Sequence, residues 1–597
     1  MASFLYELTR LYRRLADAGT VGLPIEGFAN TNVKYLLELK PDGTFARLTA
    51  REAPAKEGQK GKKELLPGLL TPAMPIRGTN ILAGTLVDVP AYIWGLRAGP
   101  KELRPEEYAV RQKAFYERTA AMAEFGDAGA QLVRKYLDSG HTPVEHPLWP
   151  KWQEQGGFVA FQRQGATGLL CQSETAQRFI REERERENRE ADQGICLITG
   201  DYGPLERLHP TIKLHGNGLA LVSFNIPSST SYGKTQGENA PVGRRAAFEY
   251  TAALNWLLGS AQTTDIGPVT YVFWTERPSS LETGLPLLNT FERQQALREM
   301  LESVRTGKWP ETDPGACFVL GLREAPDGKR LNIVTWFEED WRELRQRLLG
   351  WFADLGETIP LGTLLGALHR GKDKITEGTQ LELTAAAFEG QPLPNMVLGR
   401  VLGIEAVEIG ERNNAKLRWR SGARQALLRA YLIRNEKLEV PAMLDDHNND
   451  VGYLCGRLLA RLEQAQVMAI PRLERRRFGA PRTLVDKHYW AAFRQPVAVF
   501  PQLLALNVHH LTKAKNLNRA LGWWMQKQVD ELVGRLGTIP STLSLAQQGM
   551  FALGFRHERK ARWEKKSNGT ALPSEVEQEL RIEVEIEIGG NSAANKE

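Results

Sequence analysis

Apolar positions along the first half of the chain predict a few amphipathic helices and many short strands. At the N-terminus, Leu8, Leu11, Tyr12 and Leu15 recur at helical spacing, which predicts a helix over residues 3–18. This half is therefore typical of a mixed α/β body. The runs predict strands at 33–40, 45–50, 194–200, 218–225, 269–276, 317–322 and 331–339, and a helix at 242–258. The turn Pro41-Asp42-Gly43 is expected to join the first two strands into a hairpin, and Asp340 is expected to cap a helix after the last strand.

Helical periodicity replaces the strands from about residue 375 onward, as Leu454, Leu458 and Leu462 illustrate. The predicted fold class is α+β, with a mixed α/β N-terminal body followed by an all-α C-terminal helical bundle. The polar segment 440–450 is the best boundary between the two. We therefore expect the body at 1–439, the bundle at 440–570 and an acidic tail at 571–597.

Charge is spread unevenly over the chain. The 597 residues carry 77 Lys and Arg against 71 Asp and Glu, a formal net charge of only +6. Residues 451–570 hold 20 basic and 7 acidic side chains, whereas residues 571–597 hold 2 and 7. This asymmetry predicts a surface for nucleic acid or another polyanion near the C-terminal end.

Several classes of protein are disfavoured by what the sequence lacks. The 4 cysteines form no CxxC pair, which argues against a zinc ribbon or a disulfide scaffold and favours a reducing cytoplasm. Cys196 is expected to be a core thiol. No apolar stretch is long enough to span a membrane. We find no convincing P-loop, GxGxxG or GxSxG motif, so the sequence offers no clear catalytic set.

A polar loop at 231–241 offers donors and acceptors that suit base edges. Gln236 and Asn239 carry amides, Lys234 suits a phosphate, and flanking glycines let a duplex approach the backbone. The alternative interpretation is a structural loop whose amides satisfy neighbouring backbone groups. A second loop, at 53–63, is rich in Gly and Lys and is expected to be basic.

Cations with interleaved aromatic side chains crowd the C-terminal region, a combination that suits single-stranded nucleic acid. Trp523 and Trp524 are adjacent, so at least one is expected to face the bundle interior. The cations expected to contact nucleic acid include Arg472, Arg475, Arg476, Arg477, Lys513, Lys515, Arg559 and Lys560.

The residues at 216–258, GNGLALVSFNIPSSTSYGKTQGENAPVGRRAAFEYTAALNWLL, resemble the large subunit of the type I-C CRISPR Cascade, of the Cas8 group. Segments 75–96, 196–213, 448–466, 500–511 and 543–555 match in family order. Two places depart from the family pattern, at 321–337 and at Phe555-Arg556-His557, and residue roles are not transferred there.

The resemblance implies a non-catalytic subunit without a cofactor. Its implied tasks are to recognise the protospacer-adjacent motif (PAM) in target double-stranded DNA, help unwind it and stabilise the R-loop. Implied partners are the crRNA-containing Cascade, with its backbone and crRNA-end-binding subunits, a separate helicase–nuclease and a separately translated small subunit. The C-terminal helices resemble that small subunit, and Met443 or Met468 could be its internal start.

This hypothesis assigns roles to individual side chains. Gln236 is the preferred wedge into the duplex. The eight candidate lysines and arginines of the C-terminal region would contact the displaced strand or the heteroduplex backbone. The candidates for PAM and duplex contact are Lys60, Lys62, Lys63, Arg77, Asn80, Asn225, Lys234, Gln236 and Asn239.

Two other hypotheses stay open at the level of sequence. The first is a metal-dependent nucleic-acid-processing enzyme that uses Asp445, Asp446 and His447, although the polar cluster from Asp445 to Asp450 also suits capping of the following helix. The second is a scaffold that binds only proteins.

Overall fold

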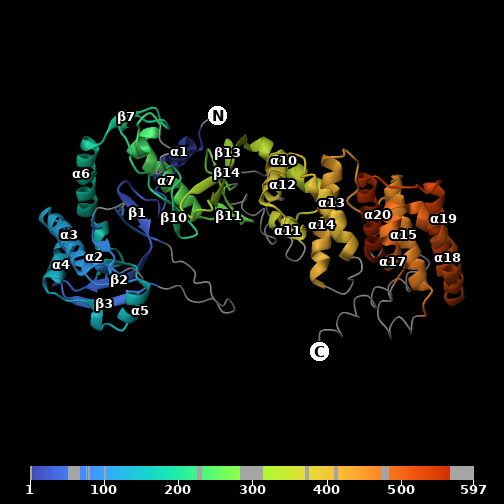
Figure 1. Ribbon diagram of the computed structural model, residues 1–597, viewed down its shortest axis with the longest axis horizontal. Helices are drawn as coiled ribbons and strands as arrows, with labels where there is room; N and C mark the ends of the chain where they lie inside the picture. Colours follow the sequence, from blue (N-terminus) through green and yellow to red (C-terminus); the bar gives the residue numbers. More distant parts are fainter. Residues whose placement is uncertain are drawn as a thin grey trace. The chain divides into compact units, whose positions relative to one another are not determined.

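The computed structural model comprises two compact units (Figure 1). Unit 1 comprises Met1–Thr263 and Leu320–Trp336, and unit 2 comprises Thr264–Val319 and Phe337–Glu597. The predicted division at residues 440 and 571 stays a prediction. The structure describes residues 3–51, 68–75, 77, 81–99, 102–224, 231–280, 282, 313–369, 375–408, 415–471 and 483–564.

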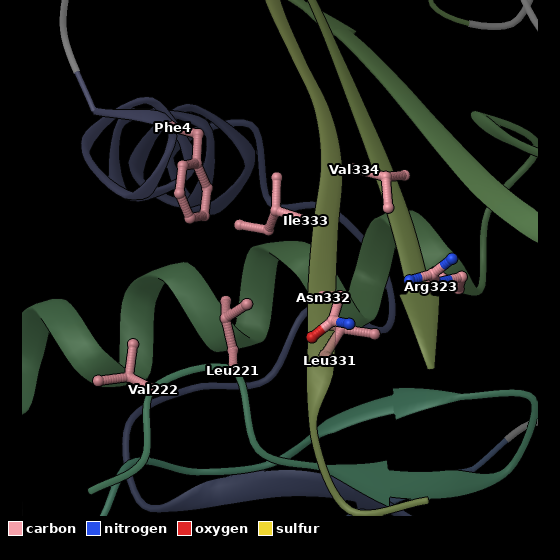
Figure 2. A pocket seen from close by; sticks show the side chains of 8 residues that line it. All are labelled: Phe4, Leu221, Val222, Arg323, Leu331, Asn332, Ile333 and Val334. Atoms are coloured by element: carbon pink, nitrogen blue, oxygen red, sulfur yellow. The ribbon is translucent and has the colours of Figure 1, made fainter. Parts of the chain in front are cut away.

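Unit 1 begins with the predicted N-terminal helix, α1 (Phe4–Asp17). Ser3 caps it, and the predicted stripe is largely buried, with Leu8 0% and Leu11 2% exposed. The helix packs on α7 (Arg244–Leu258), where Arg13 pairs with the buried Glu249 at 2.9 Å. Beside the start of α1, the ring of Phe4 helps to line an open cavity of about 420 Å³ (Figure 2). The amphipathic pattern therefore predicted both the helix and its buried face.

The main sheet of unit 1 has the strand order β3-β2-β6-β5. β2 (Val33–Leu39) alternates buried and half-buried side chains, as a strand with one face on the core does. It pairs antiparallel with β3 (Phe45–Ala50) across the predicted turn and parallel with β6 (Phe158–Arg163). β5 (Val87–Asp88) closes the sheet antiparallel to β6. The predicted hairpin at 33–50 is confirmed.

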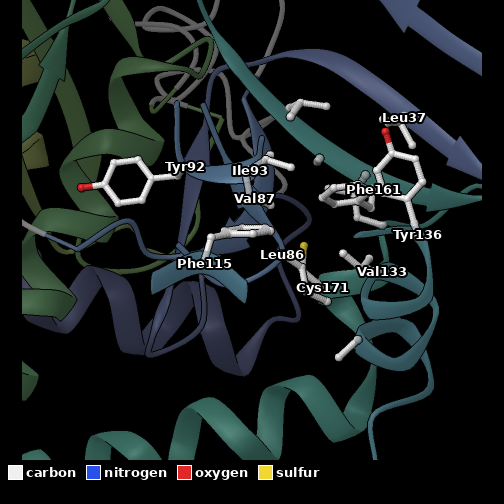
Figure 3. Close-up of a cluster of buried hydrophobic side chains, with 14 of the residues drawn as sticks. Leu37, Leu86, Val87, Tyr92, Ile93, Phe115, Val133, Tyr136, Phe161 and Cys171 are labelled. Atoms are coloured by element: carbon white, nitrogen blue, oxygen red, sulfur yellow. The ribbon is translucent and has the colours of Figure 1, made fainter. Parts of the chain in front are cut away.

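Helices cover this sheet and complete its core (Figure 3). Trp152 stacks on Tyr35 of β2 with ring centroids 4.2 Å apart, and Phe161 of β6 and Phe115 of α3 are fully buried.

The elements outside the main sheet are α1 (Phe4–Asp17), β1 (Phe28–Thr31), β4 (Leu69–Pro72), α2 (Pro90–Ile93), α3 (Pro105–Glu124), α4 (Ala128–Asp138), η1 (Pro143–Glu145), α5 (Trp149–Gln155), η2 (Leu170–Gln172), α6 (Glu174–Glu190), β7 (Gln193–Ile195), β8 (Tyr202–Pro204), β9 (Ile212–Leu214), β10 (Asn217–Leu219), η4 (Gln236–Asn239) and α7 (Arg244–Leu258).

Two predicted strands are much shorter than their apolar runs suggest. The run at 194–200 is a strand only as far as Ile195, because Gly200 donates its N–H to the Cys196 carbonyl and adopts φ +78°, which closes a turn. In the run at 218–225 the strand ends at Leu219, Ala220 adds a single bridge to Arg330, and residues 221–224 are bends and irregular backbone, while Asn225 lies outside the described residues. In the first run a turn interrupts apolar residues that otherwise favour a strand.

A second four-stranded sheet has the order β11-β12-β13-β14, and β13 and β14 contribute residues to both units. β12 is buried along its whole length, and Asp340 caps the following helix α10, as predicted. The elements are β11 (Thr263–Ile266), β12 (Val269–Thr275), β13 (Ala316–Glu324), β14 (Leu331–Asp340) and α10 (Trp341–Leu355).

The described residues after β14 form helices and connecting segments only. The predicted fold class, a mixed α/β N-terminal part followed by an all-helical C-terminal part, is therefore confirmed. The helices after α10 are α11 (Leu361–Ala367), α12 (Glu377–Phe388), α13 (Met396–Glu408), α14 (Ala415–Arg434), α15 (Val451–Met468), α17 (Leu484–Arg494), α18 (Pro496–Leu517), α19 (Arg519–Leu536) and α20 (Leu545–Glu564).

Helix α15 is the central helix of this part and packs closely on α20. Gly456 faces the Phe551 carbonyl, where an added Cβ would lie only 2.0 Å from the oxygen. Gly554 of α20 faces the Tyr453 carbonyl in the same way, at 2.3 Å. A side chain at either position would force the two backbones apart, so these glycines set the helix spacing.

The four cysteines are buried and unbonded. Burial raises the pKa of Cys171, Cys317 and Cys455 to about 12. Cys196 is 3% exposed, which confirms that it is a core thiol. None of the helices in the described ranges has the length and apolar character needed to cross a membrane.

Candidate nucleic-acid interface

The structure describes part of the predicted set of DNA-binding side chains. Arg77, Lys234, Gln236 and Asn239 are described in unit 1, and Lys513, Lys515, Arg559 and Lys560 in unit 2. Contacts by the remainder stay predictions. The residues outside the described ranges are Lys60, Lys62, Lys63, Asn80, Asn225, Arg472, Arg475, Arg476 and Arg477.

Asn239 holds the polar loop at 231–241 together. Its Oδ1 accepts the Ser231 N–H at 3.0 Å, and its Nδ2 donates to the carbonyls of Lys234 and Gln236 at 3.2 and 3.0 Å. Glu238 reinforces the turn by accepting the Thr235 N–H at 2.6 Å. Asn239 is thus a positioning residue of this loop, and its contact with a base stays a prediction.

Gln236 and Gly237 seat the loop on the backbone at residues 206–207. Gln236 adopts φ +44° and its Oε1 accepts a hydrogen bond from Arg207 at 2.6 Å. An added Cβ at Gly237 would lie 2.5 Å from the Glu206 carbonyl oxygen, so only glycine fits there. A positive φ at a non-glycine residue costs on the order of 1 kcal/mol or more, which the surrounding contacts must offset. The base of the loop is therefore firmly held.

The tip of the same loop projects an aromatic ring that sequence reasoning missed. Tyr232 is 98% exposed and adopts φ +52°, next to Gly233 at φ +72°. Lys234 is also exposed, and its ammonium has no carboxylate partner among the described residues. The usable signal was a tyrosine between Ser231 and Gly233, in a loop with no apolar periodicity. An exposed ring beside an unpaired cation can stack on a base while the cation contacts a phosphate.

Arg77 is held within unit 1. Its guanidinium lies 2.5 Å from the fully buried Asp88 carboxylate and 3.8 Å above the ring centre of Tyr92. Its Nε donates to the Leu82 carbonyl at 2.8 Å. Burial raises the pKa of Asp88, while Arg77 opposes that shift. These contacts anchor the backbone at Arg77, and groove contact by its side chain stays a prediction.

Lys513 and Lys515 lie on α18 of unit 2, close in sequence to Trp523 of α19. The Lys515 ammonium lies 3.8 Å from the centre of the Trp523 ring, and Trp523 is 54% exposed. Trp524 packs on the buried cluster that includes Met468 and Met525, which confirms that one of the two tryptophans faces inward. Within the described ranges, neither lysine pairs with a carboxylate. The α18–α19 hairpin thus combines cations with an accessible aromatic ring.

Arg559 and Lys560 have acidic neighbours in unit 2. Arg559 lies 3.5 Å from the buried Glu463 carboxylate and 5.4 Å from the Phe555 ring centre, with a quarter of its side chain exposed. Lys560 lies 4.0 Å from Glu357, and both side chains are more than half exposed. Lys560 is accessible to a polyanion, whereas Arg559 mainly braces α15 against α20.

The polar segment at 445–450 is fixed by hydrogen bonds from the helices. Asp446 pairs with Arg457 at 2.5 Å, and the Asp445 carboxylate accepts the His447 N–H at 2.8 Å. Arg535 donates to the Asn448 carbonyl at 2.7 Å. Asp450 caps α15, as predicted. Across the described ranges no group of three or more His, Cys, Asp or Glu is arranged to hold a metal ion.

By its fold the chain is an α+β protein whose described residues after β14 are helical or connecting. It has a braced polar loop in one unit and, in the other, two lysines without a carboxylate partner among the described residues. A family model described as CRISPR-associated protein (Cas_Csd1) matches residues 8–563. The chain therefore belongs to the Cas_Csd1 family, that of the type I-C Cascade large subunit. Among curated proteins, none matches the chain significantly.

Proposed function

We propose that this chain is the non-catalytic subunit that recognises the PAM in duplex DNA for a type I-C Cascade. Family membership implies a role in that complex. The observation that carries the finer proposal is the loop at 231–241, with its braced base and its exposed Tyr232 and Lys234. In crRNA-guided complexes the protein reads only a short motif, while guide pairing reads the target. A few well-placed side chains therefore suffice.

In this proposal the loop opens the duplex beside the motif. Lys234 contacts a phosphate, and the Tyr232 ring stacks on a base that leaves the helix. Gln236, the wedge predicted from sequence, would act from the base of the loop, where Arg207 holds its amide. Lys60, Lys62 and Lys63 would contact duplex phosphates, and Arg77, Asn80, Asn225 and Asn239 would act as groove-contacting or positioning residues.

The α18–α19 hairpin serves the displaced strand or the heteroduplex backbone in this proposal. Lys513 and Lys515 supply positive charge, and Trp523 supplies a ring for stacking. Arg472, Arg475, Arg476, Arg477 and Lys560 would add further positive charge for these strands, and Arg559, which mainly braces α15 against α20, would add less. Once the R-loop is stable, the complex would recruit a separate helicase–nuclease, because the chain itself carries out no cleavage.

The test uses the complex assembled with crRNA on target DNA that carries 2-aminopurine beside the motif. Tyr232→Ala should reduce opening of the duplex more than it reduces initial duplex binding. Reduced opening would be measured as a smaller increase in 2-aminopurine fluorescence. Tyr232→Phe keeps the ring and should behave like the wild type. Gln236→Ala should also impair opening more than binding. If Tyr232→Ala and Gln236→Ala both open DNA normally, the loop is not the opening element.

A second measurement addresses the basic loop and the alternatives. Lys62→Ala combined with Lys63→Ala should weaken duplex binding at all sequences and flatten its salt dependence. Equal affinity of the wild-type complex for DNA with and without the motif would favour a protein-binding scaffold. Turnover of labelled DNA by the purified chain with Mg²⁺ or Mn²⁺, lost in Asp445→Ala, would favour a nuclease.

A further inference from the structure

The hairpin of β7 and β8 in unit 1 exposes three large apolar side chains close together. Ile195 is 63% exposed, Leu197 67% and Tyr202 73%. Ile195 and Tyr202 are direct partners in the antiparallel register, so their side chains lie side by side on one face. Leu197 follows two residues later, in the adjoining turn. Single exposed apolar residues are ordinary, but a contiguous group on a short hairpin marks an interaction surface.

The hairpin is rigidly mounted, so this exposure is a fixed property of the fold. Cys196 is buried beneath the turn and donates its N–H to the Asp201 carbonyl at 2.8 Å. The Leu197 N–H donates to the Pro241 carbonyl at 2.9 Å, just before helix α7. The Leu205 N–H donates to the Asp192 carbonyl at 2.8 Å. A partner would therefore meet a preorganised surface and would lose little conformational entropy on binding it.

Charge around the hairpin indicates the chemistry of the partner. From Glu190 to Glu206 the chain carries four acidic residues and no Lys or Arg. Glu190, Asp192 and Asp201 are exposed, and in the described part of the chain none pairs with a cation. Phosphates would be repelled by this rim, whereas a protein surface with Lys or Arg around an apolar pocket would be complementary.

We propose that the β7–β8 hairpin docks into an apolar pocket, rimmed by Lys or Arg, on another protein subunit of the crRNA-containing complex. This inference rests on the proposed function only for the identity of the complex. The docking surface consists of Ile195, Leu197 and Tyr202 with the flanking carboxylates Asp192 and Asp201. It is separate in sequence from the DNA-opening loop at 231–241, although the last residue of that loop, Pro241, accepts the Leu197 N–H, and in this proposal it binds protein instead of nucleic acid.

The first test places a photo-crosslinking phenylalanine at Leu197 of the full-length chain, assembled with crRNA and the complex's backbone and crRNA-end-binding subunits. A crosslink to one of those subunits, at an apolar peptide that contains Lys or Arg, is expected. The same probe at Val21, which is 94% exposed in the same unit and lies outside the hairpin, should give no such product. Crosslinks only to crRNA, to DNA, to a second copy or within the chain would overturn the proposal, as would no crosslink.

The second test measures the affinity of the full chain for the crRNA complex that lacks it. Leu197→Asp with Tyr202→Asp should weaken binding by roughly tenfold or more, and Val21→Asp should leave it unchanged. Both positions are exposed, so the melting temperature should stay the same. If the wild-type chain itself fails to join the complex, the proposed function fails. If the wild type joins and the double variant joins equally well, only the docking inference fails.

Discussion

Glu558 lies fully buried between two arginines of the neighbouring helix. Its Oε2 accepts the Arg457 Nε–H at 2.7 Å, and its Oε1 lies 2.5 Å from Arg461. Both arginines are themselves about 95% buried, and Glu558 is the buried carboxylate that they share, while Arg457 also pairs with the more exposed Asp446 at 2.5 Å. Such a triad is costly to form, but it is still more costly to break, because a lone buried charge has no water to solvate it.

Glu558→Gln should therefore destabilise unit 2 by about 3–5 kcal/mol. Urea unfolding followed by circular dichroism measures this loss. Glu531→Gln removes an exposed carboxylate from α19 and should change the unfolding free energy by less than about 0.5 kcal/mol. A loss below about 1 kcal/mol in Glu558→Gln would contradict the importance of the triad.

The glycine contact between α15 and α20 gives a second prediction. Gly456→Ala places a methyl group against the Phe551 carbonyl and should cost about 2–4 kcal/mol, because backbone atoms must move. Gly534→Ala, in α19, meets nothing within 4 Å and should instead stabilise by up to about 1 kcal/mol. Thermal melts of the two variants should therefore shift in opposite directions, and equal shifts would count against this interpretation.

Two buried histidines should make stability depend on pH. Burial lowers the pKa of His557 and of His209 to about 4, against 6.5 when exposed. The folded state holds both imidazoles neutral, so its stability is fully present above pH 6.5. That stability is lost as the pH falls towards 4, because the histidines of the unfolded chain bind protons at a higher pH than those of the folded chain. Each histidine should lower the free energy of unfolding by about 2 kcal/mol between pH 7 and pH 5.

The comparison that isolates one of these groups uses His557→Gln. The variant loses the contact with Tyr453, where the His557 Nδ1 lies 3.1 Å from the hydroxyl, so its absolute stability is not the readout. The readout is the difference between unfolding free energies at pH 7 and pH 5, which should be smaller in the variant than in the wild type. An unchanged difference would mean that His557 does not titrate in this window.

The lysine pair on α18 should contribute to binding of the displaced strand. Lys513→Ala with Lys515→Ala should weaken binding of the assembled complex and reduce its salt slope by roughly 1.4, at about 0.7 per single-strand phosphate contact. Lys437→Ala removes an exposed lysine of the same unit and serves as the control. An unchanged slope in the double variant would remove these lysines from the interface.

The two candidate internal starts differ in what they retain. Met443 precedes α15, whereas Met468 is its last residue. A fragment that begins at Met468 lacks the helix on which α17, α18, α19 and α20 pack. We expect the 443–570 fragment to unfold cooperatively and the 468–570 fragment to bind a hydrophobic dye and melt broadly when isolated. Equal cooperativity would show that α15 is dispensable.

Local sequence signals predicted the parts of the fold that local physics controls. The N-terminal helix with its Ser3 cap, the hairpin at 33–50 and the caps at Asp340 and Asp450 all follow from spacing and capping chemistry. The strand predicted at 194–200 was longer than the observed strand. Apolar content does not reveal the turn that the hydrogen bond between Gly200 and Cys196 closes. The hydrophobic pattern alone therefore cannot distinguish a continuous strand from one that a turn interrupts.

The candidate site was harder to predict than the fold. Sequence identified the polar loop, but it could not show that Asn239 is occupied inside the loop or that Tyr232 stands at its tip. The engagement of Arg77 with Asp88, and of Arg559 with Glu463, also depends on tertiary contacts. Residue type identifies which side chains can bind a phosphate, but only packing decides which of them are unpaired.

The burial of all four cysteines makes the natural chain a ready background for site-specific labelling. Cys171, Cys196, Cys317 and Cys455 are each at most 3% exposed, which restricts the access of maleimide reagents in the folded state, although at Cys196 burial is outweighed by hydrogen bonds, which lower its pKa. One cysteine introduced at the exposed Ser231 beside Tyr232, or at the exposed Gln193 on strand β7, would carry a fluorophore without removal of any native thiol or of the side chains proposed to act. Opening of the duplex and docking of the hairpin could then be followed separately, in real time, on otherwise unaltered protein.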